Sequence, residues 1–246
     1  MIKKYNQYIK ESLLNKLKGP SDDDVIKYYL DNRKYTELLY FGLRRLKYDI
    51  IKLALENKAN TKDLLEEIYD NDFSDDSFKK LFDIIDINIF DSNDITKFLF
   101  KIYIEQREIL IPKLDFNDNQ IMYSILKELS YKSAYRTVDI LFKNKLPDNL
   151  IIYLLNKLYD NNNFELFKYI IENYEIPYHY DDDLLLYHIV SYNKWYKSDV
   201  LKLILNKDVN IYARNNDIIN HVIKEKEFNI NTYNLFKEKD KKNLMI

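Results

Sequence analysis

The chain has 246 residues, of which 46% are hydrophobic and 32% charged, so it holds enough apolar material for a sizeable core in one or two domains. Its 38 basic and 40 acidic residues leave a net charge of −2, which excludes an overall basic field for nucleic acid or anionic lipid. Only two glycines and no cysteine are present, which excludes glycine-rich phosphate loops, disulfides and thiolate zinc sites. The lack of cysteine favours a reducing compartment, and we expect a cytoplasmic protein.

The N-terminal segment, 1–20, carries charges throughout and lacks the apolar core of a signal peptide. The longest apolar runs elsewhere, such as Ile151 to Leu155, are far shorter than the ~20 residues of a membrane span. We therefore expect neither secretion nor a transmembrane segment, and we predict that residues 1–20 form a capping helix. Tyr8 to Leu14, YIKESLL, also fits the pattern of Tyr, four residues, Leu and an apolar residue by which translation-initiation partners dock on a cap-binding factor. A translation-initiation scaffold is therefore one alternative function.

An internal repeat follows from residue 21 onward. The segment DIIKLALENKAN from Asp49 reappears as DVIKYYLDNRKY from Asp24 and as DVLKLILNKDVN from Asp199. The remaining copies are RTVDILFKNKL from Arg136, ELFKYIIENYEI from Glu165 and the poorer DSFKKLFDI from Asp76. The fourth positions of the copies, at intervals of 25, 27, 60, 29 and 34 residues, are Lys27, Lys52, Lys79, Asp139, Lys168 and Lys202. Since an interval of 60 corresponds to two units, we expect a degenerate copy near Glu108, interrupted by Pro112.

Each copy is predicted to be a helix that is buried on two sides, because apolar residues surround its single charged position. We expect that charged position to face solvent. A second set of apolar runs begins after short acidic or amide residues, which are typical helix caps. These caps are Asp63, Asp94, Asn119, Asn149, Asp183 and Asp217. Each unit is therefore predicted to be a pair of helices, first a capped helix and then the repeated segment.

The predicted fold class is all-α, a helical-repeat solenoid of about six to seven antiparallel helix pairs. We expect a single domain over 1–246. Residues 21–223 would form the repeats, and the more polar segment 224–246 would form a C-terminal cap.

Two segments carry a family resemblance. LLYFGLRRLKYDIIKLALENKAN, from Leu38 to Asn60, resembles the helix, turn, helix and outgoing loop of an ankyrin repeat. DVLKLILNKDVNIYARNNDIINHVI, from Asp199 to Ile223, resembles the divergent ankyrin repeats of mimivirus-like giant DNA viruses of amoebae, whose loops commonly end in Asn-Asn-Asp, as at 215–217 here. The resemblance implies a viral protein that binds a host or viral protein in the infected cytoplasm.

The chain departs from the ankyrin pattern in its spacing and its turns. Several units are shorter than the ~33 residues of the family, which implies an ankyrin-like stack with shortened or missing β-hairpins. Lys58 and Asp208 stand where the family places the glycine that ends the second helix. We therefore predict that Asn, Asp and Lys close these turns, and that the stack is least regular between Phe73 and Lys132.

The sequence contains no recognisable catalytic or metal-binding constellation. The three histidines, His179, His188 and His221, lack the carboxylate spacing of a zinc-protease motif. The acidic runs Asp22 to Asp24 and Asp181 to Asp183 directly precede predicted helices, where negative charge favours the helix dipole, so we interpret them as caps. No serine stands in a pattern that would pair it with a histidine as a nucleophile. We expect no enzymatic activity, metal, cofactor or small-molecule substrate.

A second alternative function comes from the segment 146–158, LPDNLIIYLLNKL, which resembles the opening of an F-box. An F-box would make the protein a substrate adaptor for a ubiquitin ligase. The same segment falls in register as the start of a repeat, and we interpret it in that way.

The predicted function is non-catalytic protein binding through a strip of loop residues. Loops at equivalent places in successive repeats align on one face, and Tyr and Trp are favoured at protein interfaces. Tyrosine also occurs 23 times along the chain, so many copies are expected in the core. We expect no nucleic acid and no membrane as partner. The predicted partner-binding residues are Tyr178, His179, Tyr180, Trp195, Tyr212 and Arg214.

Overall fold

The described part of the protein, taken from a computed structural model, comprises residues 20–132, 134–191, 198–224 and 230–243. Every regular element in these ranges is a helix and none is a strand, which confirms the all-α prediction there. None of these helices combines the length and the apolar character that crossing a bilayer requires. The chain divides into two compact units, Met1–Asp86 and Ile87–Ile246, which are described one at a time. A single domain over 1–246 stays a prediction.

The first unit contains five helices in its described residues. They are α2 (Asp22–Asp31), α3 (Tyr35–Arg44), α4 (Tyr48–Glu56), α5 (Leu64–Asp70) and α6 (Asp75–Phe82). Helices α3 and α4 pack closely because Gly42 of α3 faces Ile51 of α4. A Cβ atom on Gly42 would lie 3.1 Å from Ile51 Cγ1 and 3.2 Å from its backbone nitrogen, so this glycine serves close helix packing.

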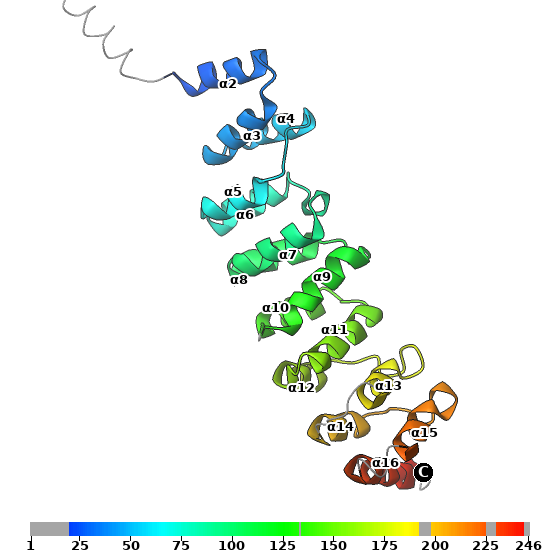
Figure 1. Ribbon diagram of the computed structural model, residues 1–246. Coiled ribbons are helices and arrows are strands. Elements are labelled where there is room, and N and C mark those ends of the chain that lie inside the picture. Colours follow the sequence, from blue (N-terminus) through cyan, green and yellow to red (C-terminus); the bar gives the residue numbers. More distant parts are fainter. Residues whose placement is uncertain (1–19, 133, 192–197, 225–229, 244–246) are drawn as a thin grey trace, which may run out of the picture. The chain divides into compact units, whose positions relative to one another are not determined.

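The helices of the second unit form two layers (Figure 1). Each helix packs on the next member of its own layer. The first layer consists of α7 (Ser92–Lys101), α9 (Asn119–Ser130), α11 (Asp148–Asp160), α13 (Leu184–Ser191) and α15 (Asp217–Lys224). The second layer consists of α8 (Ile104–Leu110), α10 (Tyr135–Lys143), α12 (Phe164–Asn173), α14 (Ser198–Leu205) and α16 (Ile230–Asn243). The described residues of this unit also contain three short 3₁₀ turns, η1 (Ile87–Ile89), η2 (Ile111–Lys113) and η3 (Arg214–Asn216).

Apolar side chains fill the space between the layers. On α11, Leu150, Leu154 and Leu158 are completely buried, as spacing by four residues on one helix face requires. Tyr159 is 1% exposed, and its hydroxyl donates to the carbonyl oxygen of Ile189 on the next first-layer helix at 3.4 Å. Since burial of a large side chain contributes roughly 1.5–3 kcal/mol, these residues account for much of the stability of the stack.

The repeated segments are all helical, as predicted: they form α2, α4, α6, α10, α12 and α14. The degenerate copy expected near Glu108 is α8, which passes into η2 at Pro112. The recurrent charged position is exposed in four copies and half-buried in two. It is exposed at Lys27, Lys52, Lys79 and Lys202, and half-buried at Asp139 and Lys168.

Several predicted helix starts are wrong by one to three residues. Helix α7 begins at Ser92, and its cap is Asp91, which accepts from the Asn93 amide at 2.8 Å, whereas Asp94 lies inside the first turn. Helix α9 begins at Asn119 itself and is capped by Asp118. The stretch around each start offers several capping side chains in a row, and packing of the first turn selects among them.

The other predicted caps also lie at or near helix starts, but they differ in whether they cap the helix. Helix α11 begins at Asp148 after Pro147, one residue before the predicted cap Asn149. Asp63 does precede α5, although its side chain accepts no capping bond. Asp217 is the first residue of α15. Ser21 caps α2 and forms a reciprocal capping box with Asp24, so the acidic run Asp22 to Asp24 forms the first turn of the helix and does not precede it as predicted.

Left-handed residues close many of the helix ends, in place of glycine. Six of them stand one residue beyond the C-cap, the position where glycine normally adopts this conformation. Lys58, for example, has φ of 61°, which confirms that a lysine closes this turn. At four of the six C-caps an Asn side chain donates to the carbonyl oxygen four residues earlier, which helps to satisfy the exposed helix end. The six residues are Arg33, Leu46, Lys58, Asp72, Lys145 and Asn162.

The prediction that the stack is least regular between Phe73 and Lys132 is not confirmed. Two of the three 3₁₀ turns in the described residues, η1 and η2, fall inside this region, but both runs of three consecutive left-handed residues, 181–183 and 214–216, lie outside it. The two 3₁₀ turns lie in the segments that join successive helices, where the neighbouring repeats have left-handed caps.

Candidate functional site

The predicted strip of loop residues lies in two neighbouring loops of the second unit. Tyr178, His179 and Tyr180 follow α12, and Tyr212 and Arg214 follow α14. Trp195 lies outside the described residues. Equivalent stretches of the two loops, 181–183 and 214–216, both have three consecutive left-handed residues. The partner-binding role of these residues stays a prediction.

Carboxylates of the first loop hold the second loop in place. The Arg214 guanidinium donates to the backbone oxygen of Asp181 at 2.7 Å and to its Oδ2 at 3.0 Å. The Arg214 amide also donates to Asp182, and the Asn210 amide donates to Asp183 Oδ1 at 3.1 Å. Asp183 directly precedes α13, and its carbonyl oxygen accepts from the Tyr187 amide at 3.0 Å. Its φ is 58° and its carboxylate faces the neighbouring loop, so a capping role of the run 181–183 stays a prediction.

Two ionisable groups of the strip, His179 and Tyr212, contact carboxylates elsewhere in the protein. His179 lies with Nδ1 3.2 Å from Asp183 Oδ2 and Nε2 3.6 Å from Asp208 Oδ2, and hydrogen bonding to Asp183 raises the pKa of its imidazole. Burial raises the pKa of Tyr178 to about 12. The Tyr212 hydroxyl donates to Asp240 of α16, which raises the pKa of that phenol. What the strip offers to a partner is therefore chiefly exposed ring surface, on Tyr180 and Tyr212.

A groove that sequence reasoning missed lies between α7 and α9 of the first layer. Its volume is about 400 Å³. Each helix lines it with five residues at positions i, i+3, i+4, i+7 and i+8, which share one face of a helix. From α7 these are Asn93, Thr96, Lys97, Phe100 and Lys101; from α9 and its C-cap they are Ser124, Lys127, Glu128, Tyr131 and Lys132. The second set follows the first by 31 residues at every position.

Two short side chains lie at the contact between the two helices. Thr96 is buried, and its hydroxyl donates to the Ser92 carbonyl oxygen at 2.7 Å while lying 3.0 Å from the Ser124 hydroxyl. The remaining lining side chains on this face are mostly long. Small residues at the contact and long residues around it leave the depression between α7 and α9.

The groove is positively charged. Four of its ten lining residues are lysines and one is an acid, Glu128, so the formal charge of the lining is +3. Glu128 is itself paired with Lys132, with 2.9 Å between Oε1 and Nζ. Within the described residues, neither Lys97 nor Lys127 pairs with a carboxylate. This local excess contrasts with the net charge of −2 of the whole chain.

An aromatic ring between two cations forms part of the groove wall. The Phe100 ring has the Lys132 ammonium 4.5 Å and the Arg107 guanidinium 5.5 Å from its centroid. Arg107 belongs to α8 of the second layer, and it donates to the Thr137 hydroxyl at 2.9 Å and to the Phe100 carbonyl oxygen at 3.3 Å. Its buried Nε has no hydrogen-bond partner among the described residues, and burial lowers the pKa of the guanidinium. Arg107 thus adds positive charge behind the groove.

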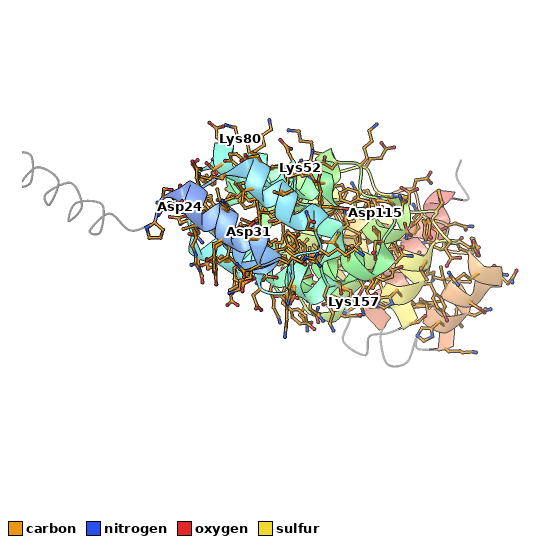
Figure 2. All side chains as sticks on the ribbon, turned by 90° about the horizontal axis from the view of Figure 1, so that it is seen from above. Asp24, Asp31, Lys52, Lys80, Asp115 and Lys157 are labelled. Atoms are coloured by element: carbon orange, nitrogen blue, oxygen red, sulfur yellow. The ribbon has the colours of Figure 1, made fainter. Side chains whose placement is uncertain are left out.

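The surface continues onto the next first-layer helices. Tyr123 of α9 packs on Tyr153 of α11 with 4.4 Å between ring centroids, and Lys157 lies one turn further along α11 (Figure 2). Asp160 at the end of α11 contacts Nε2 of His188 on α13 at 2.8 Å. A second groove, of about 450 Å³, lies on α13 and α15 and is lined by Tyr187, Asp217, Asn220, His221, Ile223 and Lys224.

The described residues contain no group of three or more His, Cys, Asp or Glu side chains that could hold a metal ion. His179, His188 and His221, the only histidines, lie in three separate places: the loop strip, the α11–α13 contact and the second groove. The arrangement on the first layer is therefore a surface of cations, hydroxyls and rings.

Comparison of this chain with known proteins gave no match. No protein-family model, no curated protein and no solved structure matches this chain.

Proposed function

We propose that the protein is a non-catalytic protein-binding module, built as an ankyrin-like helical-repeat solenoid. The observation that carries the proposal is the register of the first layer in the second unit. Residues 31 positions apart on α7 and α9 line one groove, and the same layer continues with paired rings and polar side chains onto α11. A repeated unit that presents equivalent side chains side by side is the usual way in which helical repeats recognise proteins.

Such a surface suits association because its side chains are held before the partner arrives. The Phe100 ring contacts Lys132 and Arg107, and the Tyr123 ring packs against Tyr153. Ordering a side chain on binding costs roughly 0.5–1.5 kcal/mol, so rings that are already packed avoid part of that cost. Exposed aromatic residues such as Tyr131 then supply contact area.

The resemblance to ankyrin repeats of giant viruses supports a setting for this function. We propose that the partner is a host or viral protein in the infected cytoplasm. The divergence of the turns, where Arg, Leu, Lys, Asp and Asn replace glycine, fits a distant member of such a group.

The two alternative functions rest on short segments. Residues 146–158 begin just before α11, and the apolar residues of the F-box-like stretch are buried in the stack. A ligase adaptor could reach them only if α11 left its place between the neighbouring helices. Tyr8 to Leu14, the basis of the translation-initiation scaffold, lies outside the described residues. We therefore do not extend the proposal to either function.

A photo-crosslinking comparison tests the proposal. A photoreactive phenylalanine placed at Tyr131, on the groove, is compared with the same residue at Tyr103, which does not line it. The two tyrosines are matched because their exposed fractions are 63% and 64%. We expect a discrete protein adduct from the Tyr131 position in cells. Equal adduct formation at both positions would contradict binding through the first layer.

A further inference from the structure

We propose that the groove between α7 and α9 binds a short acidic peptide segment of the protein partner. This inference rests on the proposed protein-binding function and adds the chemical class of the bound segment.

The groove carries an excess of positive charge. Lysines border the groove on both helices, and the single acid, Glu128, is already neutralised by Lys132. Each ammonium group has three donors, so Lys97 and Lys127 keep donors for ligand carboxylates. Arg107 behind Phe100 adds to the same potential. Complementary charge of this kind selects an acidic partner and speeds its association.

The length and the lining of the groove suit a short peptide segment. The α7 side runs from Asn93 to Lys101, and the eight residue-to-residue steps between them span ~12 Å of helix at 1.5 Å per step. An extended peptide covers that length with about four residues at 3.3 Å each. The Phe100 and Tyr131 rings provide apolar surface beside the lysines. The groove therefore fits a short segment that alternates carboxylates with an apolar side chain.

The surroundings favour a peptide over a nucleic acid. A polyanion that followed the first layer beyond the groove would meet Asp160 on α11 and Asp217 in the second groove. The whole chain is also net acidic, so it repels a long polyanion outside this one patch. A short acidic segment in a folded or tethered partner avoids both repulsions.

Fluorescence anisotropy with the full chain tests the inference. The probe is a fluorescein-labelled peptide with the core Asp-Glu-Leu-Glu-Asp-Glu between Gly-Ser flanks. We expect binding that weakens from low to physiological salt, as screening of exposed charges requires. The double variant Lys97→Ala with Lys127→Ala should weaken binding by about threefold to thirtyfold, since each exposed charge pair contributes a modest free energy.

The matched control is Lys52→Ala with Lys79→Ala. It removes the same charge from exposed positions of the first unit and should leave probe affinity unchanged. Equal losses in both double variants, or no loss in the groove variant, would overturn the inference. An oligothymidine that binds the groove more tightly than the peptide would overturn it in favour of nucleic acid.

The two proposals fail in different ways. If the photoreactive Tyr131 position captures a protein partner but the acidic probe does not bind, the acidic-peptide inference fails and the protein-binding function stands. If the photoreactive positions at Tyr131 and Tyr103 form adducts equally, the proposal of protein binding through the first layer fails, whatever the probe does.

Discussion

Removing the Asp139 carboxylate should weaken the contact between α10 and α12. Asp139 accepts a hydrogen bond from the Tyr169 hydroxyl at 2.7 Å and another from the Tyr174 hydroxyl at 2.5 Å. Both tyrosines belong to the unit that follows Asp139, and both rings pack on α10. The centroid distance from Tyr169 to Tyr135 is 4.9 Å, and that from Tyr174 to Phe142 is 4.1 Å.

The magnitude follows from the two hydrogen bonds. A bond to a charged group contributes roughly 1.5–3 kcal/mol when buried, and the half-buried positions of both hydroxyls place each bond at or below the low end of that range. We therefore expect Asp139→Ala to lower the free energy of unfolding by about 2 kcal/mol. Tyr174→Phe, which keeps the ring stacked on Phe142, should lower it by about 1 kcal/mol.

Urea unfolding followed by circular dichroism measures both effects, and a double-mutant cycle isolates the bond. Asp139→Ala combined with Tyr174→Phe should cost about 1 kcal/mol less than the sum of the single changes. Tyr123→Phe is the control, because the Tyr123 hydroxyl has no hydrogen-bond partner among the described residues. A loss below about 0.5 kcal/mol in Asp139→Ala, or a zero coupling, would refute the reasoning.

Four further outcomes are expected. Lys58→Gly should raise the free energy of unfolding by about 0.5–1 kcal/mol, because it relieves a left-handed φ. Lys52→Gly inside α4 should lower the free energy of unfolding by about 1 kcal/mol, because glycine is a poor helix former. Urea unfolding measures both changes and shows whether their signs are opposite. Gly42→Ala should lower the free energy of unfolding by about 1 kcal/mol in the same assay, because the new methyl group meets Ile51. The pKa of Tyr178, about 12, lies above the ordinary 10.0. The contribution of the buried neutral phenol to stability is therefore complete below pH 10.0 and is lost as pH rises towards 12. In an ultraviolet titration of the phenols, Tyr178→Phe should remove one step at high pH. His179 has a raised pKa, so its contact with Asp183 stabilises the loop fully below pH 6.5 and less as pH rises through the raised value; an NMR midpoint at or below 6.5 would contradict this.

The helices could be predicted from sequence because burial on two sides leaves a clear pattern. In DIIKLALEN every position except those of the charged and amide residues is apolar, and the same arrangement recurs at each copy. Even the degenerate copy near Glu108 could be located, since its neighbours fixed the period. Helix starts were less predictable. At the start of α7 four capping side chains occur in a row, from Asp91 to Asp94, and only the packing of the first turn decides between them.

The loop strip shows where sequence reasoning succeeds and where it stops. The repeat period predicts that the loops holding Tyr178 and Tyr212 are equivalent, and the structure places them side by side through Arg214 and Asp181. The acidic run 181–183 directly precedes α13, and its sequence alone predicts a helix cap. Its left-handed backbone turns the carboxylates towards the next loop, and such a conformation leaves no signal in a sequence without glycine there.

The groove required the structure because it depends on two helices at once. On either helix alone, a face of lysines, one aromatic residue and a hydroxyl resembles an ordinary solvated surface. It becomes a groove only when α7 and α9 align with a shift of 31 residues and Thr96 meets Ser124.

The loop strip and the groove differ in the charged groups that they offer to a partner. In the strip, His179, Tyr212 and Arg214 are bonded within the protein, so binding there should respond weakly to salt. In the groove, the ammonium groups of Lys97 and Lys127 remain available, so binding there should weaken steeply as salt rises, and salt dependence alone separates the two surfaces.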